Sequence, residues 1–266
     1  MSQYQRIACL STEAVEVMYA IGAEDLIAGI SGYTVRPARA REEKVKISGF
    51  SSAKLDRILA VKPDLVLAYS NMQSDLCKEL ISAGVEVHCF NQHSVDGIYR
   101  MITTVGLLTG RSAEAAQLTE TLQQTVQSVL MQSRQWTRRP RVYFEEWNEP
   151  LMSGIGWVSE LIRIAGGDDV FPELANCYSG RERIIADPLE VVRRAPDIII
   201  GSWCGKKFQP DQLMQREGWA QIPAVQHGQV FEIKSPDILS PGPAAIQHGL
   251  LQLQVLISGW QQQQSA

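Results

Sequence analysis

An internal duplication is the sequence feature that most constrains what this chain can fold into. Residues 16–26 (EVMYAIGAEDL) align without a gap on residues 160–170 (ELIRIAGGDDV), and the Glu, Gly and Asp are identical. Residues 55–67 (LDRILAVKPDLVL) resemble residues 189–200 (LEVVRRAPDIII), which follow in the same order after a one-residue gap. Two ordered matches at nearly the same offset predict two lobes of related topology.

Each half of the chain alternates short apolar runs with segments of helical periodicity. In the first half we expect strands at 6–10, 65–68 and 85–90 and helices at 13–21, 55–61, 75–82 and 94–108. In the second half we expect strands at 141–144, 197–201 and 230–233 and helices at 157–165, 188–194 and 243–259. Fully apolar strands such as 65–68 are typical of parallel sheets with both faces covered. The predicted fold class is therefore α/β, with two Rossmann-like lobes.

A long uninterrupted segment separates the two halves. Residues 112–134 contain no Gly or Pro and carry apolar side chains at a spacing of three or four, which predicts one amphipathic helix. At about 1.5 Å per residue this helix would be roughly 35 Å long. We therefore expect an N-terminal lobe over 1–110, a linking helix over 111–137 and a C-terminal lobe over 138–266. A single stiff connection of this kind predicts a cleft that does not hinge widely.

Composition excludes several classes of function. With 25 Lys+Arg against 29 Asp+Glu, the chain lacks the basic excess that binding to nucleic acid requires. No apolar run approaches the roughly 18 residues needed to insert into a membrane. The five cysteines form no Cys-x-x-Cys pair, so we expect neither a disulfide framework nor a zinc site. The first residues show no secretory leader. We expect a periplasmic protein if a leader has been removed and a cytoplasmic one if the chain is native as given; the thiol count favours the second.

Aromatic and amide side chains gather where the predicted strands end. Tyr69 and Asn71 follow one strand, Trp147 and Trp203 follow two others, and Trp157 opens the helix after Trp147. Ligands of α/β lobes bind at the carboxyl ends of the strands. Flat rings with a few polar groups suit a large planar ligand better than a sugar phosphate. The alternative is that these aromatic residues cap the hydrophobic core.

Catalytic and metal-binding patterns are scarce. The sequence has no G-x-G-x-x-G opening a helix, no Walker A loop and no G-x-S-x-G elbow. Cys204 precedes Lys206 and Lys207, whose charge would lower the pKa of its thiol. The four histidines form no H-x-x-x-H pattern, so a site built from protein ligands alone is not expected. His93 follows a strand and is either a solvated loop residue or an axial ligand to a metal held in a macrocycle.

Two groups of charged residues complete the candidates. Glu145 and Glu146 are adjacent in a strand or its exit, so their side chains point to opposite faces, which is poor geometry for an acid–base pair. We expect one of them to meet a ligand amide or a positive group. Arg181 and Arg183 are expected to be solvated.

The segments RIACLSTE (6–13) and KPD (62–64), with the long linking helix, resemble class III substrate-binding proteins of ABC importers, which bind cobalamin, haem or ferric siderophores. The segments YFEEW (143–147), SGIGWVSEL (153–161), IIGSWCGKK (199–207) and SPDILSPGP (235–243) are similar to the cobalamin-binding branch. The resemblance covers almost the whole chain. It implies a monomeric, non-catalytic binding protein without a built-in cofactor, which holds its ligand between two lobes joined by a backbone helix. Such a protein would serve ABC-type uptake if it is exported, and intracellular corrinoid handling if it is not.

The resemblance also implies site residues. The ligand contacts carried over are Tyr33, Phe50 and Tyr69 in the first lobe and Trp147, Trp157, Trp203 and Asp237 in the second. Asp75 lies near the family's acidic residue that docks on arginines of the permease. The implied ligand is cobalamin, with His93 or Cys204 as axial cobalt ligands. The alternatives are haem, for which Tyr33, Tyr69 or His93 would supply the axial ligand, a ferric siderophore, and a corrinoid-modifying enzyme that uses Cys204.

Overall fold

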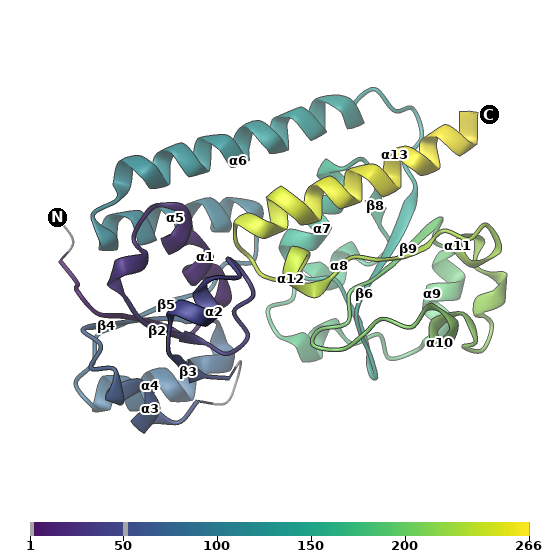
Figure 1. Ribbon diagram of the computed structural model, residues 1–266. Coiled ribbons are helices and arrows are strands. Elements are labelled where there is room, and N and C mark those ends of the chain that lie inside the picture. Colours follow the sequence, from purple (N-terminus) through teal and green to yellow (C-terminus); the bar gives the residue numbers. More distant parts are fainter. Residues whose placement is uncertain (1–2, 50–52, 266) are drawn as a thin grey trace. The chain divides into compact units, whose positions relative to one another are not determined.

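The computed structural model describes residues 3–49 and 53–265. The chain divides into two compact units, each with its own sheet (Figure 1). Unit 1 comprises Met1–Gln92 and Asp96–Leu122, and unit 2 comprises His93–Val95 and Gln123–Ala266. The long helix α6 (Ser112–Ser133) is therefore shared between the units, and the short segment 93–95 belongs to unit 2 although its neighbours on both sides belong to unit 1.

The sheet of unit 1 is parallel throughout, with the strand order β3-β2-β1-β4-β5. Its strands are β1 (Ile7–Cys9), β2 (Ile27–Ser31), β3 (Lys46–Ser48), β4 (Leu65–Tyr69) and β5 (Val87–Phe90). The remaining elements are α1 (Thr12–Ala20), η1 (Glu24–Leu26), α2 (Ala40–Glu43), α3 (Leu55–Ala60), η2 (Asn71–Gln73), α4 (Ser74–Ser82), α5 (Val95–Thr109) and the first half of α6. Because all strands run the same way, all their carboxyl ends meet at one edge of the sheet.

Helices cover both faces of this sheet, with α1 and α5 on one side and α3 and α4 on the other (Figure 1). Ala8, Leu10 and Val66 pack with Ile58 of α3 and Leu80 of α4 in one buried cluster. Leu65 and Leu67, which alternate with Val66 along β4, are buried as well, so strand residues are apolar on both faces, as the run at 65–68 predicted.

The sheet of unit 2 has the order β10-β9-β6-β7, and β8 also pairs with β6. Its strands are β6 (Arg141–Asn148), β7 (Leu151–Ser153), β8 (Asp168–Asp169), β9 (Ile198–Gly201) and β10 (Val230–Glu232). Only β7 is antiparallel to its neighbour. The parallel order β8-β6-β9-β10 repeats the order β2-β1-β4-β5 of unit 1, so the duplication read from the sequence corresponds to a repeated topology.

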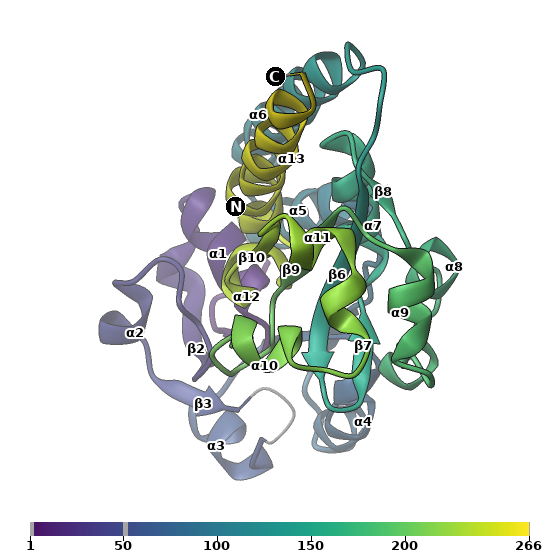
Figure 2. The same ribbon diagram turned by 90° about the vertical axis from the view of Figure 1, so that its right-hand side faces the viewer.

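The helices of unit 2 also cover both faces of its sheet (Figure 2). They are α7 (Gly156–Ile164), α8 (Pro172–Ala175), η3 (Gly180–Arg183), α9 (Leu189–Arg194), α10 (Pro210–Met214), η4 (Trp219–Gln221), α11 (Pro223–Gln226), α12 (Ser235–Ile238), the π-helical turn η5 (Ala245–Leu250) and α13 (Leu251–Ser265). On one face Tyr143 and Ile199 pack with Val191, Leu213 and Trp219. The other face of β6 lies against α7 and α13, where a Cβ on Gly167 would meet Val142, Ile162 and Ile257.

The predicted α/β fold of two similar lobes is confirmed, and the predicted helices agree with the structure to within one or two residues at most ends. Gly22 and Gly166, at equivalent positions in the repeat, both end a helix with positive φ, +69° and +93°. The sequence reading missed β2, β3, β7 and β8, which have two to five residues each. It also ended β6 at Phe144, whereas this strand continues to Asn148 and turns back into β7.

Candidate functional site

The carboxyl edge of the sheet in unit 1 carries three of the predicted ligand contacts. Tyr33 follows β2 and is 58% exposed, while Tyr69 ends β4 and Asn71 follows it. Between β2 and β4 lies only β1, and neighbouring strands are about 4.8 Å apart, so the two tyrosines belong to one edge. The backbone N–H of Tyr69 donates to Gln73 Oε1 at 3.0 Å, and Gln73 Nε2 donates to the Leu10 carbonyl oxygen at 3.3 Å. These bonds fix the end of β4 relative to β1.

In unit 2, Glu145 lies at the centre of a buried hydrogen-bond network. Its carboxylate is fully buried and accepts from Arg216 Nη1 at 2.6 Å, Arg216 Nη2 at 2.9 Å, Trp203 Nε1 at 2.9 Å and Tyr143 Oη at 3.0 Å. A buried carboxylate is tolerated when it is paired and hydrogen-bonded in this way. Burial, and then the Glu145 charge, raise the pKa of Tyr143 well above its usual value, so its hydroxyl remains a donor. The network ties β6 to the segment after β9.

Glu146 has a different set of partners. Its carboxylate accepts from Arg183 Nη1 at 2.6 Å and from Nη2 at 3.0 Å, and the same Nη1 donates to the Ser153 carbonyl oxygen. The expectation that the two glutamates face opposite ways is confirmed by these separate partners. The expectation that Arg183 is solvated is wrong, because the residue is only 3% exposed. Both carboxylates already meet an arginine of this chain, so the positive group predicted for one of them comes from the protein itself.

Trp147 and Trp203 lie together around a lysine. Lys206 Nζ is 4.4 Å from the centroid of the Trp147 ring and 5.3 Å from that of Trp203. Trp147 is half-buried, whereas Trp203 is 3% exposed and packs edge-on against Phe208 at 5.0 Å. The structure therefore places most of the Trp203 ring in the core of unit 2, as the alternative reading of the aromatics anticipated.

His93 and Trp157 meet elsewhere in unit 2. Their ring centroids are 6.4 Å apart, and the imidazole also contacts the exposed Tyr178 edge-on at 4.5 Å. The segment carrying His93 lies against α7, because the Val95 N–H donates to Glu160 Oε2 at 2.7 Å. The absence of a side chain at Gly156 also permits this contact, since a Cβ at position 156 would lie 2.2 Å from the His93 carbonyl oxygen. Burial, and then the charge of Arg183, lower the pKa of His93, so the imidazole is neutral at pH 7. A neutral imidazole is the form that ligates a metal.

Trp157 also contacts the segment that carries Asp237. Trp157 is 2% exposed and donates its indole N–H to the Ile238 carbonyl oxygen at 2.8 Å. Asp237 precedes that residue, and its Oδ2 accepts from Gln252 Nε2 at 3.0 Å. Phe50 lies outside the described residues.

The expected activation of Cys204 by its lysine neighbours is wrong. Desolvation, and then the Glu146 charge, raise the pKa of the Cys204 thiol instead of lowering it. This environment disfavours the thiolate, which is the nucleophilic form.

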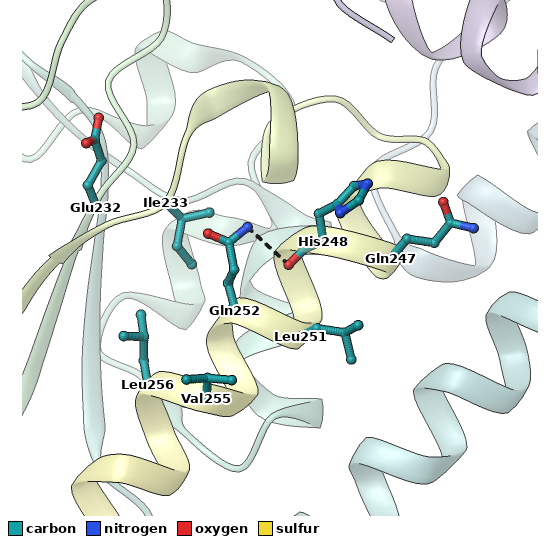
Figure 3. A pocket seen from close by; sticks show the side chains of 8 residues that line it. All are labelled: Glu232, Ile233, Gln247, His248, Leu251, Gln252, Val255 and Leu256. Carbon is teal, nitrogen blue, oxygen red and sulfur yellow. Dashed lines mark hydrogen bonds between the residues drawn. The ribbon is translucent and has the colours of Figure 1, made fainter. Parts of the chain in front are cut away.

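Two hollows of unit 2 adjoin β10. One, of about 290 Å³, is lined by Trp203, Gly205, Lys206, Lys207, Glu232, Lys234, Ser235 and Pro236. The other, of about 400 Å³, lies against the C-terminal helical segment, and Figure 3 shows its lining side chains. Leu251, Val255 and Leu256 form an apolar wall of this second hollow. In the same helical segment, Gln252 Nε2 donates to the His248 carbonyl oxygen at 3.3 Å.

Within residues 3–49 and 53–265, no group of three or more His, Cys, Asp or Glu side chains is placed to hold a metal ion. In the same residues, no helix combines the length and the apolar character needed to cross a membrane.

Sequence reasoning missed the two arginines that pair with Glu145 and Glu146, and the position of Lys206. Arg183 at the end of η3 and Arg216 after α10 reach Glu146 and Glu145 from 37 and 71 residues away, and no local pattern signals such a pair. From the sequence, Lys206 was considered only as a charge close to Cys204. A turn in which its N–H donates to the Trp203 carbonyl oxygen brings it back over the two rings.

Comparison with known proteins agrees with this fold. The periplasmic binding protein family model matches residues 7–236. A vitamin B12-binding protein of Vibrio parahaemolyticus is 24% identical over 246 residues, which is 91% of this chain and 86% of that protein. Among solved structures, the vitamin B12-binding protein BtuF of Vibrio cholerae superposes with a TM-score of 0.79 at 20% identity, covering 98% of this chain and 99% of that one. The haem-binding protein RhuT of Roseiflexus sp. RS-1 gives 0.84 at 19% identity, covering 96% and 98%.

Two similar α/β units, together with the family match over residues 7–236, define a substrate-binding protein rather than an enzyme. The chain belongs to the periplasmic binding protein family.

Proposed function

We propose that this protein binds a corrinoid and delivers it to an ABC-type importer. The observation that carries the proposal is the similarity over 91% of the chain to a vitamin B12-binding protein. The half-buried Trp147, the exposed Tyr33 and the amide of Asn71 support it, because a corrinoid presents a broad, partly apolar face with many amides. Tyr69, Trp157, Trp203 and Asp237 are the remaining proposed contacts.

Further parts of the proposal concern partners and location. As a binding protein of its family, the chain would work in the periplasm, as a monomer, with Asp75 in the exposed first turn of α4 offered to a permease. No cofactor is built in, since the corrinoid is cargo.

Haem is the second candidate ligand. A solved haem-binding protein has the same fold, and His93 is a neutral, half-buried imidazole of the kind that can serve as an axial ligand. This candidate would be favoured if the Soret band of haem shifts on binding to wild type but not on binding to His93→Ala, and if wild type binds cobalamin weakly or not at all.

Titration with cyanocobalamin, haem and ferrichrome, followed by tryptophan fluorescence and calorimetry, tests the proposal. We expect one-to-one binding of cyanocobalamin at micromolar or lower Kd and much weaker binding of the other two. Equal or tighter binding of haem would replace the corrinoid proposal, and no binding of cyanocobalamin would refute it.

A further inference from the structure

The hollow lined by three lysines in unit 2 lies at the edge of the sheet where α/β folds bind ligands. Strands β9 and β10 are parallel neighbours, with Gly201 opposite Glu232, so the chain leaves both strands at the same edge. The segments that follow, with Lys206 and Lys207 after β9 and Lys234 after β10, line one hollow of about 290 Å³. This arrangement brings together lysines that are 27 residues or more apart in sequence, as only the fold can do.

The charges of this hollow do not cancel. Lys234 Nζ lies 2.6 Å from Glu232 Oε2, so these two form a pair. Lys206 and Lys207 form no ion pair with any carboxylate among the described residues. The nearby carboxylates Glu145 and Glu146 are occupied by Arg216 and Arg183. Two ammonium groups therefore remain without a counter-charge at the ligand edge.

One of these ammonium groups is also held in place. Lys206 Nζ lies over the Trp147 ring and near that of Trp203, and Trp203 is fixed in turn by its bond to Glu145. A lysine on an aromatic face gives up some rotational freedom before any ligand arrives, and it keeps N–H donors for a further partner. A positioned cation beside a flat ring matches a ligand that carries a single anionic group next to a planar surface.

We propose that Lys206 and Lys207 bind an anionic group of the ligand, and specifically the phosphodiester of a complete corrinoid. This inference rests on the proposed function, since among corrinoids only those with the nucleotide loop carry a phosphodiester. The lysines then select complete cobalamin over its precursor cobinamide, which lacks that group. For haem, the same chemistry would bind a propionate carboxylate.

The test compares two corrinoids in wild type and in the Lys206→Met/Lys207→Met variant. The variant loses the charge-assisted hydrogen bonds of two ammonium groups, so we expect the Kd for cyanocobalamin to rise at least tenfold. The Kd for dicyanocobinamide should stay within about twofold. The variant Lys206→Arg/Lys207→Arg keeps both charges and should retain most of the cyanocobalamin affinity. Lys78→Met, on an exposed position of α4, is the matched control and should bind both like wild type.

Other outcomes overturn the inference in distinguishable ways. If both corrinoids lose affinity equally in the methionine variant, Lys206 supports the Trp147 ring and binds no anion. If wild type binds neither corrinoid, the corrinoid proposal fails. The anion site is then tested by comparing the Kd for haem with that for haem dimethyl ester, which lacks the free propionate carboxylates. When neither haem species binds, dimethyl phosphate is titrated while the indole N–H resonances of Trp147 and Trp203 are followed. Absence of a lysine-dependent shift then refutes the site.

Discussion

Arg216 donates hydrogen bonds to both carboxylate oxygens of Glu145, from Nη1 at 2.6 Å and from Nη2 at 2.9 Å. The glutamate side chain is fully buried in unit 2. The guanidinium also lies 4.5 Å from the centroid of the Trp219 ring. This pair anchors the segment after β9, which carries Trp203 and the two proposed anion-binding lysines, to the central strand of the sheet.

Replacement of Arg216 should lower the stability of the protein. Arg216→Met leaves an uncompensated charge in the core, so we expect the free energy of unfolding to fall by about 3–5 kcal/mol. Urea unfolding followed by circular dichroism measures the change. Arg193→Met is the matched control: its partners Asp187 and Glu190 lie on the surface, and such pairs contribute about 1 kcal/mol or less. A loss for Arg216→Met no larger than for this control would show that the buried pair stabilises little.

Substitutions of Trp203 and Trp147 should differ in their effects on stability and on ligand binding. Trp203 is almost fully buried, so Trp203→Ala should lower the free energy of unfolding by about 3–5 kcal/mol. Trp147→Ala, at a half-buried ring, should cost less than about 1.5 kcal/mol while weakening ligand binding severalfold. Unfolding and titration are measured on both variants. Equal stabilities would show that the Trp203 ring is not part of the core.

Glu13 predicts a pH dependence of stability. This residue is 4% exposed in the first turn of α1, and burial raises its pKa to about 7 from an ordinary value near 4.5. Below pH 4.5 the carboxyl is protonated in both states and contributes no difference. As pH rises from about 4.5 to 7, the unfolded state releases the proton first, so the folded state loses stability; above pH 7 the loss is constant.

The variant Glu13→Gln removes this titration. We expect its advantage over wild type to grow between pH 4.5 and 7, by about 3.5 kcal/mol at most, since one pKa unit corresponds to about 1.4 kcal/mol. Thermal unfolding at several pH values measures the difference. Glu79→Gln, on an exposed position of α4, should show no such trend. A difference between Glu13→Gln and wild type that does not change with pH would place the pKa of Glu13 at its ordinary value.

Cys77 and Cys89 should form a disulfide under oxidation. Cys77 of α4 belongs to the buried cluster against which Val87 of β5 packs, and its thiol interacts with that of Cys89, two residues further along on the same face of the strand. Burial, and then the neighbouring Cys89 thiol, raise the pKa of Cys77 to about 11, so exchange should be slow at pH 7 and faster at pH 9. Exchange with oxidised glutathione releases two molecules of glutathione and joins the two sulfurs.

Mass spectrometry checks this outcome. The protein should lose about 2 Da, the two thiol hydrogens, and peptide mapping should join residue 77 to residue 89. Cys89→Ser should prevent the linkage. Formation of glutathione adducts on Cys89 without an internal link would show that the two thiols do not come close enough.

The sequence by itself determined the two-lobe α/β architecture and the family. Local periodicity, the duplicated segments and the glycines at 22 and 166 each depend on neighbouring residues, which is why they can be read without a fold. The same reasoning found the ends of β4 and β9 to within one residue and, with them, the aromatic candidates Tyr69 and Trp203, but it ended β6 four residues early, so Trp147 lies inside that strand.

Only the tertiary structure decided what those candidates touch. Whether Glu145 meets a ligand or Arg216, whether Arg183 is solvated, and whether Cys204 is activated depend on partners tens of residues away. Contacts of that kind depend on how loops cross the sheet edge, and the hydrophobic pattern of a single segment carries no information about them. The uncompensated charge of Lys206 and Lys207 became visible for the same reason, once the carboxylates around them were seen to be already paired.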